Sequence, residues 1–341
     1  MSGSHRGNPR GSLRLLSLLA VLGLGLATAP AYASPLMPLP QDAATAAAQV
    51  GPQIVDIDAK LGYQSAIGAG TGIVIDGSTI LTNNHVVAGA TDLTARSIAN
   101  GQTYPASVIG YDRQHDIAVL QLAGGGLPAA NIGNSDTLSV GQPVVSMGNA
   151  GGAGGAPSVA EGRISALNQT VSANDALTGS TETLVGLIQV DANIRPGDSG
   201  GPTVNSANQV VGMNTAASQN YHLGRGQGFA IPINEAMAIA GQIRSGGGSP
   251  TVHIGPTAFL GVGVNDAPGG GGAIVRQVIP TGPAAGAGIN TGDVITSVNG
   301  QPVNSATTLT NILDQHHPGE GVSVGLQDRG TNVTLADGPP G

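Results

Sequence analysis

The chain contains no cysteine, so disulfide bonds and cysteine-ligated metal sites are excluded. It also has no tryptophan, and only two phenylalanines and five tyrosines among its 341 residues. Basic residues are few: the chain has one lysine and eleven arginines, compared with 20 acidic residues. The resulting net charge of −8 argues against nucleic acid or an anionic membrane surface as a partner, since both attract basic proteins.

Long apolar runs are absent except near the N-terminus, where Leu15 to Ala27 is almost wholly apolar. Arginines precede this run, and the small-x-small pattern Ala31-Tyr32-Ala33 follows it. This pattern predicts a cleaved signal peptide over residues 1–33, and hence a protein of the cell envelope or the extracellular medium. An uncleaved membrane anchor is the weaker alternative, because the run is shorter than the roughly 20 residues that a spanning helix needs. Cleavage would remove three arginines and take the charge to −11.

The rest of the chain divides at a glycine- and serine-rich stretch. Short β-rich runs between Gly, Asn and Ser clusters extend from Ile54 to Ile233 and predict an all-β barrel domain. Asn234 to Arg244 has the pattern of a helix capped by Asn234. We therefore predict a β domain over residues 43–244, a flexible linker over 245–256 and a small second domain over 257–336.

The stretch Gly197-Asp198-Ser199-Gly200-Gly201-Pro202 has the composition of a loop that presents a nucleophilic serine. Its glycines permit a tight turn and close approach of a substrate. Backbone N–H groups in such a loop can converge on the oxyanion of a tetrahedral intermediate. We therefore predict an oxyanion hole formed by Gly197, Asp198 and Ser199. Taken alone, the stretch could equally be an ordinary glycine-rich turn.

Two residues that could activate this serine precede it in the sequence. His85 lies where a β-rich run becomes polar, and Asp116 opens an apolar run. Taken singly, they could be a strand-end histidine and a strand-start cap. A serine needs a base to remove its proton, however, and the base needs an orienting acid. The order His, Asp, Ser is that of the chymotrypsin-like double barrel. We therefore predict a catalytic triad of His85, Asp116 and Ser199 in the cleft between two barrels.

Four segments together resemble the high-temperature-requirement-A (HtrA) family of serine proteases: Thr82–Val87, Asp116–Leu120, Gly197–Pro202 and Gly228–Pro232. The resemblance runs from about Ala43 to Ala336. It implies an all-β, chymotrypsin-like double barrel followed by a small α+β PDZ domain. Most HtrA sequences carry Asn before the catalytic serine, where this chain has Asp198. Because that position contributes mainly backbone, the difference does not put the triad in doubt.

The segment over residues 257–336 carries the PDZ part of the resemblance. Gly282–Ile289 and Gly292–Gly300 match the family's signature. The resemblance places a carboxylate-binding loop and its adjoining strand at Phe259, Leu260, Gly261 and Val262. Ser305 is expected to cap a helix whose residues Leu309 and Ile312 form a groove wall for C-terminal peptides.

The resemblance also locates a primary specificity pocket, whose residues are expected to be Asn193, Ile194, Val211, Met213 and Asn214. No acid stands where a trypsin-like pocket needs one. We therefore expect cleavage after small or medium aliphatic residues.

The sequence thus predicts a secreted serine endopeptidase that needs no cofactor or metal and degrades unfolded or misassembled envelope or extracellular proteins. The alternative is a largely dormant protease that serves as a PDZ-based chaperone or peptide-binding scaffold. The family resemblance also suggests a homotrimer.

Overall fold

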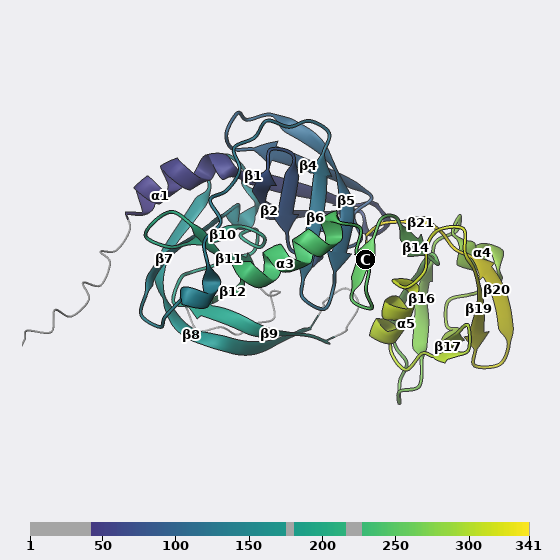
Figure 1. Cartoon of the computed structure of the whole chain (residues 1–341). Coiled ribbons are helices and arrows are strands. Elements are labelled where there is room, and N and C mark those ends of the chain that lie inside the picture. The colour runs from purple at the N-terminus through teal and green to yellow at the C-terminus, as the bar shows by residue number, and fades with distance from the viewer. Residues whose placement is uncertain (1–41, 175–180, 216–226, 341) are drawn as a thin grey trace, which may run out of the picture. The chain divides into compact units, whose positions relative to one another are not determined.

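The structure is a computed structural model, and it describes residues 42–174, 181–215 and 227–340 (Figure 1). The predicted signal peptide over residues 1–33 lies outside the described residues. No helix in the described ranges is both long and apolar enough to cross a membrane.

The first barrel consists of six antiparallel strands in the order β5-β4-β1-β2-β3-β6, and β6 pairs again with β5 to close the ring. The strands are β1 (Ile54–Leu61), β2 (Ala66–Asp76), β3 (Thr79–Thr82), β4 (Asp92–Ser97), β5 (Thr103–Asp112) and β6 (Ile117–Leu122). Strand β6 is apolar on both faces because each face is covered. Ile117 and Val119 belong to the core shared with the second barrel, whereas Ala118 and Leu120 belong to the core of the first.

The second barrel closes in the order β10-β11-β12-β9-β8-β7. Its strands are β7 (Pro143–Gly148), β8 (Ser158–Asn174), β9 (Thr181–Val190), β10 (Pro202–Val204), β11 (Val210–Thr215) and β12 (Gly228–Pro232). The barrel has its own core, which includes Val144, Ile188, Val190 and Val211. The sequence prediction of an all-β double barrel is therefore confirmed.

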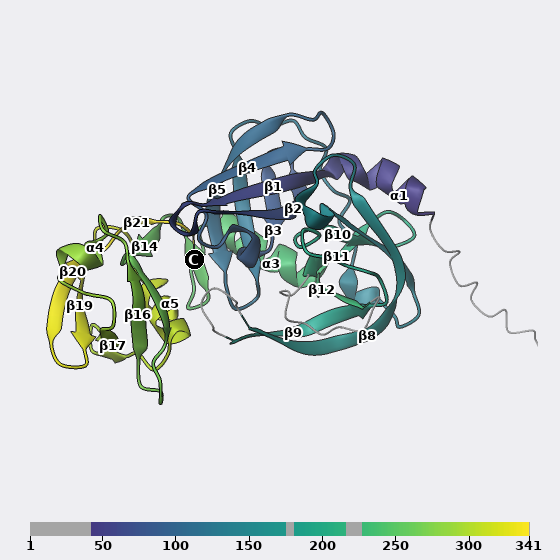
Figure 2. The ribbon, with the colours of Figure 1, turned by 180° about the vertical axis from the view of Figure 1, so that it is seen from behind.

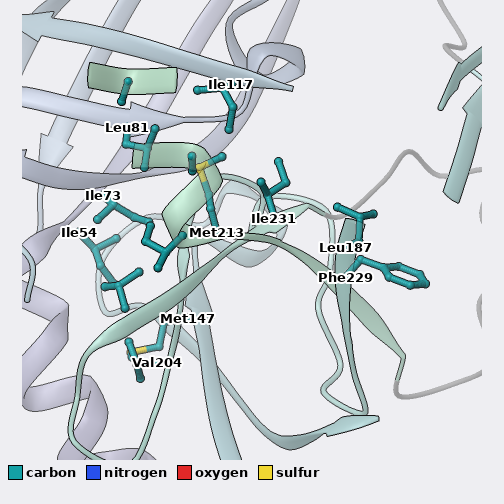
Figure 3. Packing of buried hydrophobic residues seen from close by; sticks show 14 of the residues in the cluster. Ile54, Ile73, Leu81, Ile117, Met147, Leu187, Val204, Met213, Phe229 and Ile231 are labelled. Carbon is teal, nitrogen blue, oxygen red and sulfur yellow. The ribbon is translucent and has the colours of Figure 1, made fainter. Parts of the chain in front are cut away.

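A continuous core joins the two barrels (Figure 3). Ile54, Ile73 and Leu81 enter it from the first barrel, while Met147 and Met213 enter it from the second. All five side chains are buried. Because burial of apolar surface drives folding, this shared core holds the barrels together. It thereby fixes the relative positions of the loops at their junction.

Helices are short and lie at the outside of the barrels. They are α1 (Ala43–Val50), α2 (Asn84–Val87) and α3 (Ile233–Arg244), with 3₁₀ turns η1 (Gly51–Gln53), η2 (Gly62–Gln64), η3 (Ser135–Thr137) and η4 (Ala150–Gly152). Helix α3 contacts β5 and β6 of the first barrel and β11 and β12 of the second (Figure 1, Figure 2). It begins one residue before the predicted start. Asn234 does not cap it, since the Asn234 side chain bonds Ser135 and Asn134 instead.

The C-terminal domain contains a sheet in the order β15-β16-β17-β19-β20, with β18 paired to β17, and a separate pair of strands, β14 and β21. Ser305 caps α5 as predicted, because its side chain accepts a hydrogen bond from Thr308 N. The elements are β14 (Thr257–Phe259), β15 (Val262–Asp266), β16 (Ala273–Val278), α4 (Pro283–Gly286), β17 (Val294–Val298), β18 (Gln301–Pro302), α5 (Ala306–Leu313), β19 (Gly321–Leu326), β20 (Gly330–Thr334) and β21 (Ala336–Gly338).

The segment predicted as a linker, residues 245–256, contains a strand. Val252–Ile254 forms β13, which pairs antiparallel with β5 and so adds a strand to the sheet of the first barrel. Val252 and His253 are buried. The chain is therefore fixed to the first barrel after it leaves α3, and the glycine-rich part ends before Val252.

A carboxylate is buried on an inner strand of the first barrel. Asp56, on β1, is only 4% exposed, and the N–H of Gly155 donates to its Oδ2 at 3.3 Å. Burial outweighs this bond and the nearby Arg96, and it raises the pKa of Asp56 from its ordinary value of 3.8 to about 6. The ionised form of Asp56 therefore destabilises the folded state.

We predict that Asp56→Asn removes a pH dependence of stability. A carboxyl whose pKa rises on folding favours the folded state below pH about 4, and this contribution is lost as pH increases through about 6. The free energy of unfolding of the wild type should therefore fall, relative to the variant, by up to about 3 kcal/mol over this range. Urea denaturation from about pH 4 to pH 7 measures the difference. A constant difference between the two proteins would contradict the prediction.

Candidate active site

His85 and Asp116 form a hydrogen-bonded pair. His85 is on α2, and its Nδ1 lies 2.9 Å from Asp116 Oδ2. The backbone N–H of His85 also donates to Asp116 Oδ1 at 3.0 Å. Since the carboxylate can only accept when ionised, it holds the imidazole proton on Nδ1. The other ring nitrogen, Nε2, is then the acceptor, as a general base requires.

Asp116 is held by groups from two other segments, residues 83–85 and Thr215. It is 3% exposed and has φ of +56°, a left-handed conformation that Asp tolerates better than most residues. The Asn83 side chain donates to its backbone carbonyl at 3.0 Å, and Thr215 Oγ1 donates to Oδ2 at 3.3 Å. The acid that orients His85 is therefore itself fixed, with Thr215 supplied by the second barrel.

Ser199 follows a tight β-turn. The N–H of Asp198 donates to the carbonyl of Arg195 at 2.9 Å and closes the turn. Pro196 occupies the second position, and Gly197, with φ of +95°, the third, as a type II turn favours. The sequence Arg195-Pro196-Gly197-Asp198 therefore encodes the bend that precedes the serine.

The peptide planes of this turn are fixed by bonds to their carbonyl oxygens. Pro196 O accepts from Gly151 N at 2.8 Å, and Asp198 O accepts from Gly201 N at 3.0 Å. In a trans peptide the N–H points away from the C=O of the same plane. The N–H groups of Gly197 and Ser199 therefore point away from these partners. This is the arrangement that an oxyanion hole needs.

Thr71 joins the serine turn to the first barrel, and the sequence analysis did not identify it. Its N–H donates to Ser199 O at 2.8 Å, and its hydroxyl donates to Gly197 O at 2.7 Å and accepts from Asn149 N at 2.9 Å. Thr71 is fully buried on β2. The only available signal was its position between two glycines, Gly70 and Gly72, where strands and helix α2 approach closely.

Strand β11 connects the serine to the His85–Asp116 pair. Asn214 exchanges two backbone hydrogen bonds with the residues after the serine: Gly200 N donates to Asn214 O at 2.9 Å, and Asn214 N donates to Gly201 O at 2.7 Å. The next residue, Thr215, contacts Asp116. Two consecutive residues of β11 thus contact both the segment after Ser199 and the acid Asp116.

The predicted pocket residues divide into exposed and buried positions. Asn193 is exposed, and Ile194 is partly buried against Gly228 of β12, where any larger residue would collide with it. The other three residues are buried: Val211 lies in the core of the second barrel, Met213 lies in the core shared by the two barrels, and Asn214 is a buried polar residue. Asn214 uses its side chain to bond Thr203, Met147 and Asp198. The side chains of Val211, Met213 and Asn214 are therefore not part of the exposed surface.

The predicted peptide site of the second domain lies at one edge of its sheet. Leu260 O and Gly261 O accept bonds from Ala284 N and Ile279 N, both at 2.9 Å, so the N–H groups of Gly261 and Val262 point the other way. Among the described residues, strand β15 pairs with β16 and is the first strand in the order of the sheet. Leu309 and Ile312, predicted as a groove wall, are 1% and 5% exposed within the domain core.

We predict that Thr71→Val destabilises the fold. Valine has nearly the same shape as threonine, but it lacks the hydroxyl that Thr71 uses in this buried position. Asn149 N–H loses its acceptor and Gly197 O loses a donor. The free energy of unfolding should fall by about 2–4 kcal/mol, measured by urea denaturation. Thr71→Ser is the matched control: it keeps the hydroxyl and should cost about 1 kcal/mol for the lost methyl. Equal stability of the Val and Ser variants would argue against this role for the hydroxyl.

Among the described residues, no group of three His, Cys, Asp or Glu side chains is placed to hold a metal ion.

Comparison with known proteins agrees with the two-domain architecture. Residues 70–213 match the trypsin-like peptidase domain, and residues 258–336 match the PDZ domain. The structure is also similar to that of the HtrA-type protease AlgW with a tripeptide, with a TM-score of 0.53 and 28% sequence identity. That match covers 88% of this chain and 98% of the other.

Two curated relatives are also described as serine proteases. The serine protease PepD of Mycobacterium tuberculosis is 37% identical over 90% of this chain and 68% of its own length. A probable periplasmic serine endoprotease DegP-like of Pseudomonas savastanoi pv. phaseolicola is 38% identical over 73% of this chain and 50% of its own length. The chain thus spans from half to two thirds of these relatives. It belongs to the HtrA family of serine endopeptidases, with a trypsin-like protease domain followed by a PDZ domain.

Proposed function

We propose that the chain hydrolyses peptide bonds with Ser199 as nucleophile, His85 as general base and Asp116 as the acid that orients His85. The observation that carries this proposal is the hydrogen bond between His85 Nδ1 and Asp116, together with its connection through Thr215 and Asn214 to the serine turn. Asn214 and Thr215 both lie on β11, so one strand of the second barrel supports the segment after Ser199 and also Asp116.

The reaction follows from the proton positions. Nε2 of His85 takes the proton of Ser199 Oγ as the oxygen attacks the peptide carbonyl. The N–H groups of Gly197 and Ser199 stabilise the oxyanion that forms. The imidazolium, stabilised by Asp116, then gives its proton to the leaving amine. Water, activated by the same histidine, hydrolyses the acyl-enzyme and releases Ser199.

The substrates that we propose are unfolded or misassembled proteins of the cell envelope or the medium. Two things support this: the signal-peptide pattern of residues 1–33, and the description of a relative as periplasmic. Asn193 and Ile194 offer no acid for a basic side chain, so we propose cleavage after small or medium aliphatic residues. The PDZ domain would bind C-terminal peptides along β15. The family suggests a homotrimer, which we include in the proposal.

The second candidate is a largely dormant protease in which the PDZ domain acts as a chaperone or scaffold. Incubation of the chain from Ser34 onwards with β-casein separates the two. Degradation supports the endopeptidase. If casein remains intact even with PDZ-binding peptides present, the scaffold is favoured.

We predict that Ser199→Ala abolishes casein degradation without changing the thermal unfolding temperature, because the serine supplies the attacking oxygen. His85→Ala should be about as damaging, since the triad acts as a unit. Asp116→Asn should lower kcat by about 10⁴, because it favours the wrong tautomer of His85. A fluorophosphonate probe should label Ser199 alone, as mass spectrometry would show. Undiminished turnover in the Ser199→Ala protein would overturn the assignment.

A further prediction concerns the PDZ domain. A peptide with an apolar C-terminal residue should bind at Phe259–Val262 and raise the rate of hydrolysis of a short chromogenic peptide. The comparison protein is the chain truncated after Gly255, which keeps β13 and therefore the complete sheet of the first barrel. Activation requires tighter binding to the active state, so affinity alone is insufficient. Equal stimulation of the full and truncated chains would exclude control through the PDZ domain.

A further inference from the structure

Asp198 carries a buried carboxylate immediately before the proposed nucleophile. The residue is 4% exposed and lies in the turn that closes between Arg195 and Asp198. From the sequence we expected this position to contribute mainly backbone. The structure instead gives both of its carboxylate oxygens a hydrogen-bond partner.

The first oxygen reinforces the turn itself. The N–H of Arg195 donates to Asp198 Oδ2 at 2.9 Å, and the N–H of Asp198 donates back to Arg195 O at 2.9 Å. The two ends of the turn are therefore joined twice, once through the backbone and once through the side chain. Removing the side chain would leave one buried bond to hold the bend.

The second oxygen anchors the turn to the second barrel. Ser158 Oγ, on β8, lies 2.5 Å from Asp198 Oδ1. The same hydroxyl lies 2.9 Å from Gly148 O and accepts from Ala150 N at 3.3 Å. Residues 149 and 151 in turn bond the carbonyls of Gly197 and Pro196. Ser158 thus connects the carboxylate to the segment that orients the proposed oxyanion hole.

Close packing at this point leaves little freedom. A Cβ added at Gly148 would lie 2.5 Å from Asp198 Cα and 2.8 Å from Oδ1, so glycine is required for the turn to approach β7. Asp198 thus packs against Gly148 of β7 and is hydrogen-bonded to Ser158 of β8.

Both protonation states of Asp198 can maintain these contacts. Burial raises the pKa of Asp198. An ionised carboxylate accepts from Ser158 and from Arg195 N–H. A neutral carboxyl can donate to Ser158 Oγ, whose single proton then goes to Gly148 O. An asparagine could reproduce the second pattern, with its amide donating to Ser158 and its carbonyl accepting from Arg195.

We propose that Asp198 is a positioning residue of the oxyanion hole: its two side-chain hydrogen bonds, to Arg195 N–H and to Ser158, hold the peptide planes that direct the N–H groups of Gly197 and Ser199 at the substrate. This inference rests on the proposed function of Ser199. It assigns a catalytic consequence to a side chain that does not touch the substrate.

The experiment compares Asp198→Ala with Asp198→Asn in the full chain from Ser34. Hydrolysis of a chromogenic peptide gives kcat and KM, and two inhibitors probe the site. One is a tripeptide boronic acid, whose tetrahedral adduct with Ser199 places an oxygen in the oxyanion hole. The other is the same tripeptide as an amide, which does not.

We expect Asp198→Ala to lower kcat by about 100-fold, on the scale of losing one oxyanion donor, with KM changed by less than about threefold. The boronic acid should bind more weakly by a similar factor, and the amide should bind as before. Asp198→Asn should stay within about threefold of the wild type in every measurement. Ser158→Ala, which removes one of the two bonds, should lose about tenfold in kcat. Asp136→Ala, an exposed acid remote from the turn, is the matched control.

Three results would overturn the inference: an unchanged kcat in Asp198→Ala, equal weakening of the boronic acid and the amide, or an Asn variant as impaired as the Ala variant. If Asp198→Ala does not fold, Ser158→Ala and Asp198→Asn decide the question by the same measurements. The proposed function itself is judged separately. A wild type that neither hydrolyses peptides nor reacts with a fluorophosphonate at Ser199 contradicts the function, whereas an active wild type with a fully active Asp198→Ala contradicts only this inference.

Discussion

The hydrogen bonds of Thr71 are the constraint on which the arrangement of the candidate site depends. Its N–H and hydroxyl hold the carbonyls of Ser199 and Gly197, which belong to the other barrel, and Thr82 Oγ1 donates to the carbonyl of Thr71 itself at 2.7 Å. A peptide plane has one orientation once its carbonyl is bound. One threonine therefore links the packing of the two barrels to the orientation of the peptide groups on either side of the serine.

The site as a whole is assembled from both barrels. His85, Asp116 and Thr71 come from the first, while Ser199 and the supporting pair Asn214 and Thr215 come from the second. The apolar core shared by the barrels, with Leu81, Ile117 and Met213 among its members, sets the distance between the two halves. Because interiors are close-packed, a small loss of volume in this core would be felt at the site.

The sequence indicated the candidate reactive residues more readily than the groups that support them. His85, Asp116 and Ser199 stand out because their residue types and order are rare combinations, and the double barrel follows from short β-rich runs between turns. Thr71 and Ser158 could not be found in the same way, since a buried hydroxyl that bonds a distant carbonyl has no local pattern. Asp198 was expected to contribute mainly its backbone. The partners of its side chain lie three and 40 positions away, so no local pattern indicated them.

The contrast between local patterns and distant partners also explains which secondary-structure predictions were right and which were wrong. Ser305 was correctly expected to cap α5, because capping depends on neighbouring residues alone. Asn234 was expected to cap α3, yet its side chain bonds the distant Ser135. Strand β13 was missed for a related reason. Val252–Ile254 is too short to be recognised without its partner β5, which lies far back in the sequence.

Strand β13 also has a consequence for the order in which the molecule can be completed. The sheet of the first barrel begins at Ile54, but its last strand is supplied by residues up to Ile254, after the entire second barrel. While the chain emerges from a ribosome, part of β5 therefore keeps an unpaired edge. The first barrel cannot reach its final hydrogen bonding until nearly three-quarters of the 341 residues have passed. A late strand of this kind delays the completion of the first barrel until most of the chain has been synthesised.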